Sequence, residues 1–254
     1  MQLVGQAISH TKFGKGVVSE TTAGTITIIF QDAEKKFLFP DAFEHFLALR
    51  NKEEQNQINE LITKLALKRA AQESTRHDEQ EHNNRISNLK VTPTSQVAFG
   101  FIKNTREQVF STWTVSTGSY LGGNSKGNPR IPKRMQFNSA CLLTECPKGA
   151  SEKERRIIGV FMVKDGFEGA LCEDGIINSH EKYKIQLDDT ESLPFWDYFS
   201  SDVAVPKWGN MEFKYFSNQT MQSILEDMYA NISDSERHQA AKDFYHYFLR
   251  VNKL

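Results

Sequence analysis

A segment near the middle of the chain combines aromatic rings with positive charge. It carries two aromatic residues and four cations: Trp113, Tyr120, Lys126, Arg130, Lys133 and Arg134. Cations attract phosphates, and an exposed ring stacks on an unpaired base with a free energy of roughly 1–3 kcal/mol per base. Four glycines between residues 118 and 127 allow the loop unusual backbone conformations. The segment predicts a nucleic-acid contact; the alternative is a solvated loop with Trp113 in the core.

A second aromatic cluster lies closer to the C-terminus. Residues 195–199 read Phe-Trp-Asp-Tyr-Phe, and a further tryptophan follows at position 208. A flat, apolar wall suits a nucleobase, so Trp196 and Trp208 are predicted to line a base pocket. The alternative interpretation is that these rings pack in a core or at an interface, where aromatic clusters are common.

Carboxylates and a lysine in the same region suggest a third kind of chemistry. Asp202 precedes the sequence Glu212-Phe213-Lys214, which is expected on a strand. Alternate strand residues point the same way, so Asp202, Glu212 and Lys214 could surround a magnesium ion, as in a metal-dependent nuclease. The pattern is short enough to arise by chance in a charged chain. Apart from this alternative, we expect no catalytic residue, no cofactor and no metal site.

The charges are distributed unevenly along the chain. The 31 Lys+Arg and 32 Asp+Glu leave a net charge of −1. Residues 90–165, however, hold 12 basic and 5 acidic side chains, a net +7, and residues 166–254 hold 8 and 15, a net −7. A local excess of this size attracts an anionic partner, because exposed charges act within about 8–10 Å. Alternatively, the basic and acidic thirds neutralise each other.

Residues 91–254 read as a domain that positions these side chains. Short β-like runs with loops between them predict a mixed or antiparallel sheet at Gln96–Ile102, Gln108–Trp113, Ala140–Thr144, Arg156–Lys164, Tyr183–Leu187 and Met211–Phe216. Two amphipathic patterns after Thr220 and Ser233 predict C-terminal helices that pack on the sheet.

The centre of this domain has a familiar pattern. An apolar strand ending at Thr144, a charged hairpin from Glu145 to Arg155 and a second apolar strand over 156–163 follow each other. This order resembles the strand–loop–strand centre of the PUA-like superfamily, which includes the ASCH, EVE and YTH domains. The resemblance covers roughly residues 95–190. It implies a pocket with aromatic walls that reads RNA or modified DNA bases, with Trp113, Trp196 and Trp208 as candidate walls.

The first 49 residues predict a small β-barrel of five short strands. The string Ile8–Val18 contains His-x-Lys-Phe-Gly-x-Gly-x-Val, and β-rich runs follow at Ile26–Phe30 and Lys36–Phe37. These residues resemble the SH3/Tudor-like barrel that is appended to some superfamily-1 DNA helicases and is related to modules that contact RNA polymerase. The resemblance implies binding of nucleic acid or of a protein partner. His10, Lys12 and Phe13 are the candidate surface residues, although Phe13 could instead belong to the core.

A helical connector is expected over residues 50–90. Apolar residues recur at positions 58, 61, 62 and 65, the spacing of one helix face, within a segment from Lys52 to about Arg76. From Gln72 to Asn88 the chain becomes almost wholly polar, as in a solvated helix extension or a linker. The segment 52–76 is a second candidate for binding a protein partner.

The predicted fold is therefore α+β: a small barrel (1–49), a helix and polar linker (50–90) and a PUA-like domain with C-terminal helices (91–254). The function expected is binding of DNA or RNA, as a reader of single-stranded or modified bases. The alternatives are an adaptor that docks on a larger nucleic-acid enzyme and, third, the nuclease. The sequence has no stretch of about 18 apolar residues, so no membrane span is expected. A cytoplasmic location is expected.

Overall fold

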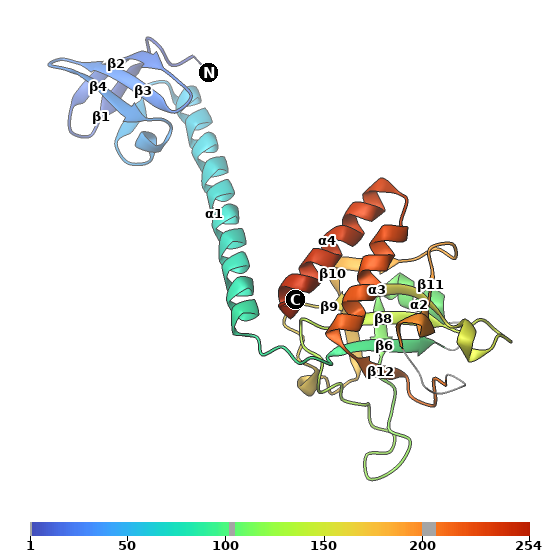
Figure 1. Ribbon diagram of the computed structural model, residues 1–254. Helices are drawn as coiled ribbons and strands as arrows, with labels where there is room; N and C mark the ends of the chain where they lie inside the picture. The colour runs from blue at the N-terminus through green and yellow to red at the C-terminus, as the bar shows by residue number, and fades with distance from the viewer. Residues whose placement is uncertain (1, 102–104, 200–206) are drawn as a thin grey trace. The chain divides into compact units, whose positions relative to one another are not determined.

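The chain forms a mixed α+β structure, as predicted. The computed structural model describes residues 2–101, 105–199 and 207–254. It divides into two compact units, Met1–Asn88 and Leu89–Leu254. The first contains an antiparallel sheet and a long helix, and the second a curled mixed sheet with helices that follow it (Figure 1).

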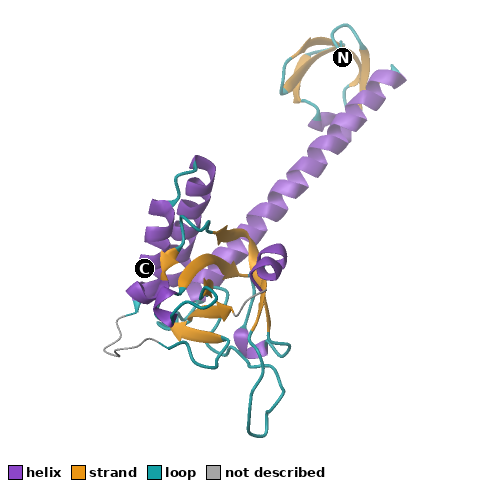
Figure 2. Ribbon diagram, turned by 90° about the vertical axis from the view of Figure 1, so that its right-hand side faces the viewer, coloured by secondary structure: helices purple, strands orange, loops and turns teal. Residues whose placement is uncertain are grey.

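The first unit contains a five-stranded antiparallel sheet in the order β4-β3-β2-β1-β5. Its strands are β1 (Ala7–His10), β2 (Gly14–Thr21), β3 (Thr25–Phe30), β4 (Glu34–Leu38) and β5 (Leu47–Leu49). Alternate residues of β3 and β1 point into a core that includes Ile8, Ile26 and Ile28. The strands curl around this core in Figure 2. A 3-10 helix, η1 (Asp41–Glu44), connects β4 to β5.

His10 organises the turn that follows β1. Its Nδ1 atom accepts hydrogen bonds from the backbone N–H groups of Lys12 (2.9 Å) and Phe13 (3.3 Å). The ring is 9% exposed and packs among aromatic neighbours, with Phe13 at 4.7 Å and Phe46 stacked at 5.9 Å between ring centroids. Phe13 itself is 40% exposed and Lys12 is exposed. Of the three predicted surface residues, His10 is thus buried and structural.

The predicted connector is one continuous helix, α1 (Lys52–Asn88). The polar stretch after Gln72 is the helix extension, one of the two interpretations that the sequence left open. Ile58 is fully buried in the core of the first unit, and Ile62 packs against it. Arg69 forms an ion pair with Asp41 at 3.2 Å. The rest of the helix is held by its own backbone hydrogen bonds and by pairs such as Arg85 with Glu81.

The second unit is built on a mixed sheet in the order β12-β6-β8-β9-β10-β7, with β11 added beside β9. Among the described residues, β6 and β8 are parallel and every other pair is antiparallel. The strands are β6 (Gln96–Phe101), β7 (Thr114–Ser116), β8 (Ala140–Glu145), β9 (Arg156–Val163), β10 (Ile176–Gln186), β11 (Leu193–Pro194) and β12 (Phe213–Phe216). Three 3-10 helices lie between them: η2 (Glu152–Glu154), η3 (Gly169–Leu171) and η4 (Phe195–Tyr198).

One element of this unit differs from the sequence prediction. The run Gln108–Trp113, predicted as a strand, lies mostly in a helix, α2 (Thr105–Thr112). Apolar residues occur there at the adjacent positions 109 and 110. This pattern does not distinguish the 3.6-residue period of a helix from the two-residue period of a strand. Trp113 ends the helix with φ 51°, a left-handed conformation typical of helix C-termini, and the chain continues directly into β7.

Two antiparallel helices, α3 (Asn218–Asn231) and α4 (Ser235–Asn252), lie side by side against one face of the sheet (Figures 1 and 2). Each begins at a side-chain cap, Ser217 for α3 and Asp234 for α4. Their apolar faces include Ile224, Phe244 and Phe248, all fully buried. The opposite face of the sheet holds a second core around Phe99, Leu143 and Phe161. No helix of the described residues is long and apolar enough to cross a membrane.

A buried amide joins the helices to the sheet. Gln96, at the start of β6, is fully buried. Its Nε2 donates to Asn218 Oδ1 (3.0 Å) at the start of α3 and to Asn252 Oδ1 (3.1 Å) at the end of α4. Its Oε1 accepts from the backbone N–H of Ala140 (2.6 Å) at the start of β8. One side chain therefore fixes four elements.

We expect Gln96→Leu to destabilise the second unit. Leucine fills a similar volume but leaves the buried N–H of Ala140 without its acceptor, which costs about 1–3 kcal/mol. Asn218 Oδ1 and Asn252 Oδ1 keep their bonds from Ser95 and Asn138 but lose the one from Gln96, at about 0.5–1.5 kcal/mol each, so a total loss of about 2–6 kcal/mol is expected. All three tryptophans lie in this unit, so urea denaturation followed by tryptophan fluorescence measures it. The control is Gln186→Leu, which replaces an exposed glutamine at the end of β10. Equal stability of the two variants would contradict this role.

We also expect the first unit to lose stability below neutral pH. Burial, and secondly the charge of Lys12, lower the pKa of His10 from its ordinary value of 6.5. Below pH 6.5 the unfolded chain takes up a proton that the folded ring refuses, so stability falls until the pH reaches the folded pKa. Amide hydrogen exchange in β1 and β2 should therefore accelerate at pH 5.5 relative to pH 7.5, after correction for the intrinsic rates.

The matched variant is His10→Asn. An asparagine Oδ1 also accepts backbone hydrogen bonds from residues just ahead of it, but it does not titrate. The acceleration at low pH should disappear in this variant. If it persists, another group carries the pH dependence.

Candidate functional site

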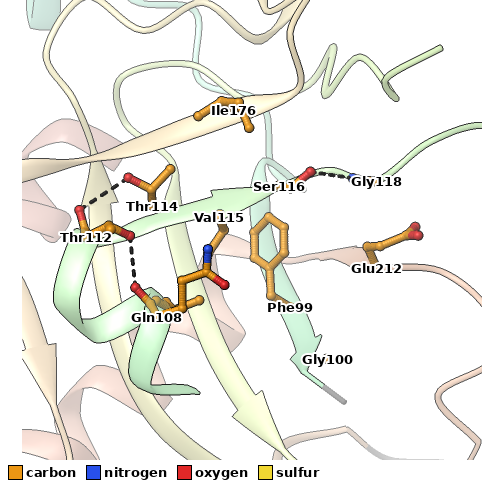
Figure 3. Close-up of a pocket in the computed structure, with 11 residues that line it drawn as sticks. Phe99, Gly100, Gln108, Thr112, Thr114, Val115, Ser116, Gly118, Ile176 and Glu212 are labelled. Atoms are coloured by element: carbon orange, nitrogen blue, oxygen red, sulfur yellow. Dashed lines mark hydrogen bonds between the residues drawn. The ribbon is translucent and has the colours of Figure 1, made fainter. Parts of the chain in front are cut away.

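A cavity of about 560 Å³ opens at the end of the sheet of the second unit. Its lining comes from β6, α2, β7, the start of β10 and the residue before β12 (Figure 3). The residues that line it are Phe99, Gly100, Gln108, Val109, Thr112, Thr114, Val115, Ser116, Gly118, Ile176 and Glu212. Apolar groups and a few polar side chains thus share one concave site, which is the usual composition of a ligand pocket.

The polar groups of the cavity come from different elements. Gln108 lies on α2 and is exposed, while Thr114 and Ser116 alternate along β7 and face the same side. Glu212 enters from the other side, so that Figure 3 shows Gln108 and Glu212 on opposite sides of the Phe99 ring. Hydroxyl, amide and carboxylate groups can together donate and accept hydrogen bonds.

Glu212 is held against the backbone of Gly118. A Cβ atom at Gly118 would lie 2.1 Å from Glu212 Cδ, and the glycine has φ +68°, so both space and conformation require glycine. Glu212 Oε2 is buried and accepts no hydrogen bond from the described residues. The Nε atom of Arg130 lies 3.6 Å from this oxygen and forms an ion pair with it.

The predicted loop, residues 118–134, is an ordered arm that begins at the cavity. Ser119 and Pro129 form an isolated β-bridge, and Arg130 donates its backbone N–H to Gly118 O (2.8 Å). Tyr120 and Gly127 are joined by a backbone hydrogen bond of 2.9 Å. In Figure 1 this arm is the long green loop that projects away from the sheet.

The predicted cations of the arm divide into two groups. Arg130 is largely buried: its side chain is 12% exposed, and its Nε donates to Ser119 O at 2.9 Å. Lys126, Lys133 and Arg134 are exposed and form no ion pair with the described residues. Arg134 lies 5.1 Å from the Tyr215 ring centroid. The three exposed cations are the ones available to a phosphate, with Tyr120, 37% exposed, beside them.

Trp113 takes the core position that the sequence left as the alternative. Its ring packs against Phe110 at 5.2 Å and Phe161 at 6.4 Å and joins the core cluster. It does not line the cavity, although its neighbours Thr112 and Thr114 do. The left-handed backbone conformation at Trp113 allows its ring to face the core while Thr112 and Thr114 face the cavity.

Trp196 and Trp208 do not line this cavity and surround a lysine. Trp208 packs against Gly100 and lines a second cavity of about 540 Å³ together with Arg155 and Lys207. The Nζ of Lys214 is 6.0 Å from the Trp196 ring centroid and 5.2 Å from that of Trp208, and Arg155 covers Trp208 at 4.4 Å. Trp208 is only 8% exposed, and the indole of Trp196 donates to Glu152 O at 2.6 Å. Burial lowers the pKa of Lys214. Protein cations thus already occupy the positions at which a base would stack on Trp208.

The two described residues of the nuclease alternative, Glu212 and Lys214, have different partners. Glu212 faces Arg130, whereas Lys214 Nζ donates to the carbonyl of Lys207 at 3.0 Å. Asp202 lies outside the described residues. Within the described ranges, no group of three or more His, Cys, Asp or Glu side chains is arranged to hold a metal ion.

Sequence reasoning missed Gln108, Thr114 and Ser116 as cavity residues. The segment 111–114 stands out in the sequence for its tryptophan rather than for the hydroxyls beside it. The alternation of Thr114, Val115 and Ser116 is the one available signal, since it places two hydroxyls on one face of a strand. Compared with models of known families, the chain matches none, and a search of curated proteins finds no matching relative.

We expect Arg130→Met to loosen the arm. The variant removes a hydrogen bond from a charged donor to Ser119 O and the pairing with Glu212, a loss of about 1–3 kcal/mol. Amide exchange at Tyr120, Gly127 and Arg130 should accelerate about 10-fold or more, as measured by NMR. Lys126→Met, at the exposed arm tip, is the control and should leave these rates unchanged. Equal rates in both variants would show that backbone pairing alone orders the arm.

Proposed function

We propose that this protein binds single-stranded nucleic acid, with the backbone on the arm and an unpaired base in the cavity. The observation that carries the proposal is the junction of the two features at Gly118. This residue lines the cavity and also pairs with Arg130 at the base of an arm whose three exposed cations form no ion pair with the described residues. A partner that brings negative charge and a flat polar ring together fits both surfaces.

The cavity has the size and polarity for a base. Its volume of about 560 Å³ lies within the range of roughly 300–1,000 Å³ that small-molecule pockets have. Phe99 and Val115 supply apolar surface, and Gln108, Thr114 and Glu212 supply hydrogen-bonding groups at its sides. An unstacked base needs both kinds of contact, because its faces are apolar and its edges are polar. A duplex hides both, so a single strand is the preferred partner.

The resemblances drawn from the sequence support the same proposal. A mixed sheet with a pocket at its end and C-terminal helices on one face is compatible with a PUA-like domain, whose members read bases. The curled five-stranded sheet of the first unit is compatible with an SH3/Tudor-like barrel. In this proposal the second unit binds DNA or RNA, and the first unit is an accessory module.

A specific observation favours the adaptor alternative for the first unit. Phe13 and Phe46 are 40% and 51% exposed beside His10, and Lys35 lies 5.8 Å from the Phe13 ring centroid. Exposed aromatic patches of this kind are typical of interaction surfaces. Protein binding through this patch would add to nucleic-acid binding by the second unit and does not replace it.

The experiment uses fluorescence anisotropy with labelled single-stranded and duplex DNA and RNA at 50 and 200 mM salt. The triple variant Lys126→Ala, Lys133→Ala, Arg134→Ala should weaken binding to single strands by 10-fold or more. It should also reduce the slope of log K against log salt by about 0.7 for each phosphate that the variant no longer neutralises. Because the three cations face phosphates rather than base edges, affinity should fall alike for all sequences.

The matched control removes three exposed lysines elsewhere on the same unit: Lys90→Ala, Lys164→Ala, Lys242→Ala. It changes the net charge by the same amount but leaves the arm intact. Equal losses of affinity in the two triple variants would mean that only the overall charge matters. Absence of binding to every probe at 50 mM salt would reject the proposed function and leave the adaptor as the next hypothesis.

A further inference from the structure

We infer that Glu212 makes the cavity selective for guanine. This inference rests on the proposed function and specifies which base the cavity accepts. A carboxylate is a hydrogen-bond acceptor only, so its hydrogen-bond partners must be donors. Glu212 is the one carboxylate that lines the cavity among the described residues, and it lies on the side opposite Gln108 (Figure 3).

The carboxylate is ion-paired with Arg130, but one of its oxygens receives no hydrogen bond from the described residues. Oε2 is buried without a hydrogen-bond partner among the described residues. The adjacent backbone N–H of Gly118 is directed to Ser116 Oγ (3.2 Å), and the Nε–H of Arg130 is directed to Ser119 O (2.9 Å). These two N–H groups therefore do not donate to Glu212. A buried carboxylate oxygen without a donor costs free energy, which a ligand that supplies N–H groups would recover.

Arg130 nevertheless makes the carboxylate compatible with an anionic partner. Its guanidinium lies 3.6 Å from Glu212 Oε2, so the pair is close to neutral as a unit. Without it, Glu212 would repel the phosphates that flank a bound base. The arrangement keeps the acceptor while compensating for its charge.

Only guanine offers the complementary edge. Its N1–H and 2-amino group are two adjacent donors that point the same way, which matches the two oxygens of a carboxylate. Cytosine and adenine each place one amino donor beside an acceptor nitrogen, which repels a carboxylate. Uracil and thymine place one N–H between two carbonyl acceptors. At the other side, the Gln108 amide can donate to guanine N7, the acceptor on the Hoogsteen edge.

The test compares heptamers that differ only in the central base. Labelled single-stranded oligothymidylate and oligouridylate carry guanine, inosine, adenine, cytosine or the background base in the centre, and anisotropy gives each Kd. We expect guanine to bind at least 10-fold more tightly than the background base. Inosine lacks the 2-amino group and should lose about 3-fold or more of this preference.

Glu212→Gln is the decisive variant, because an amide replaces one acceptor with a donor at constant shape. The guanine preference should fall below 2-fold, while binding of the homopolymer heptamer is retained. The control is Glu226→Gln, an exposed residue on α3 that removes the same charge and should keep the preference. Thermal unfolding confirms that both variants are folded.

The outcomes separate this inference from the proposed function. If no heptamer binds at 50 mM salt, both the proposed function and this inference are rejected. If the heptamers bind with the expected salt dependence but without a guanine preference, only the assignment of guanine is rejected. If guanine is preferred equally by Glu212→Gln, another group reads the base and the role of Glu212 is rejected.

Discussion

The buried amide of Gln96 is the constraint on which the second unit depends. Its bonds reach Ala140, Asn218 and Asn252, and so fix the starts of β8 and α3 and the end of α4 relative to β6. Strand β6 then carries Phe99 and Gly100 to the cavity, three and four residues further on. Residues opposite each other in a sheet keep their register, so fixing the start of the strand also fixes its end. The position of the cavity is thus set by a polar contact at the other end of β6.

The sequence predicted the elements better than it predicted the site. Periodic apolar patterns identified the C-terminal helices, and apolar runs identified β6, β8 and β9, because these elements bury much of their surface. The same spacing identified the first part of α1, although this helix buries only Ile58 and Ile86. The strand predicted in place of α2 was wrong because eight residues with two adjacent apolar positions fit either element equally well. The cavity could not be predicted, since its residues come from four elements and two loop residues that only the sheet order brings together. The tryptophans were predicted to form the walls of a base pocket. Trp113 and Trp208 instead pack against other side chains, and small hydroxyl residues line the cavity.

The basic excess of residues 90–165 illustrates the same limit. A count from the composition treats every cation alike, but in the structure some cations are buried or paired with carboxylates and others are exposed. Arg155 lies buried over Trp208, and Arg106 pairs with Glu145 and with Asp189 of the acidic third. The pairs of Arg106 with Asp189 and of Arg130 with Glu212 join the basic and the acidic third, as in the alternative in which the two thirds neutralise each other. The arm is the exception, because its exposed cations have no acidic partner among the described residues. A charge excess therefore indicates a binding surface only after the structural pairs have been subtracted.

Arg130 connects the two halves of the proposed site. Its backbone closes the arm at Gly118, its side chain holds Ser119, and its charge offsets Glu212. A phosphate that approached the arm would compete with Glu212 for this guanidinium. If the ion pair between Arg130 and Glu212 weakened, a hydrogen bond from a base to the carboxylate would become more favourable. A base that donates to Glu212 would in turn release Arg130 toward the phosphate. Contacts to backbone and base would then reinforce each other, because both change the same ion pair.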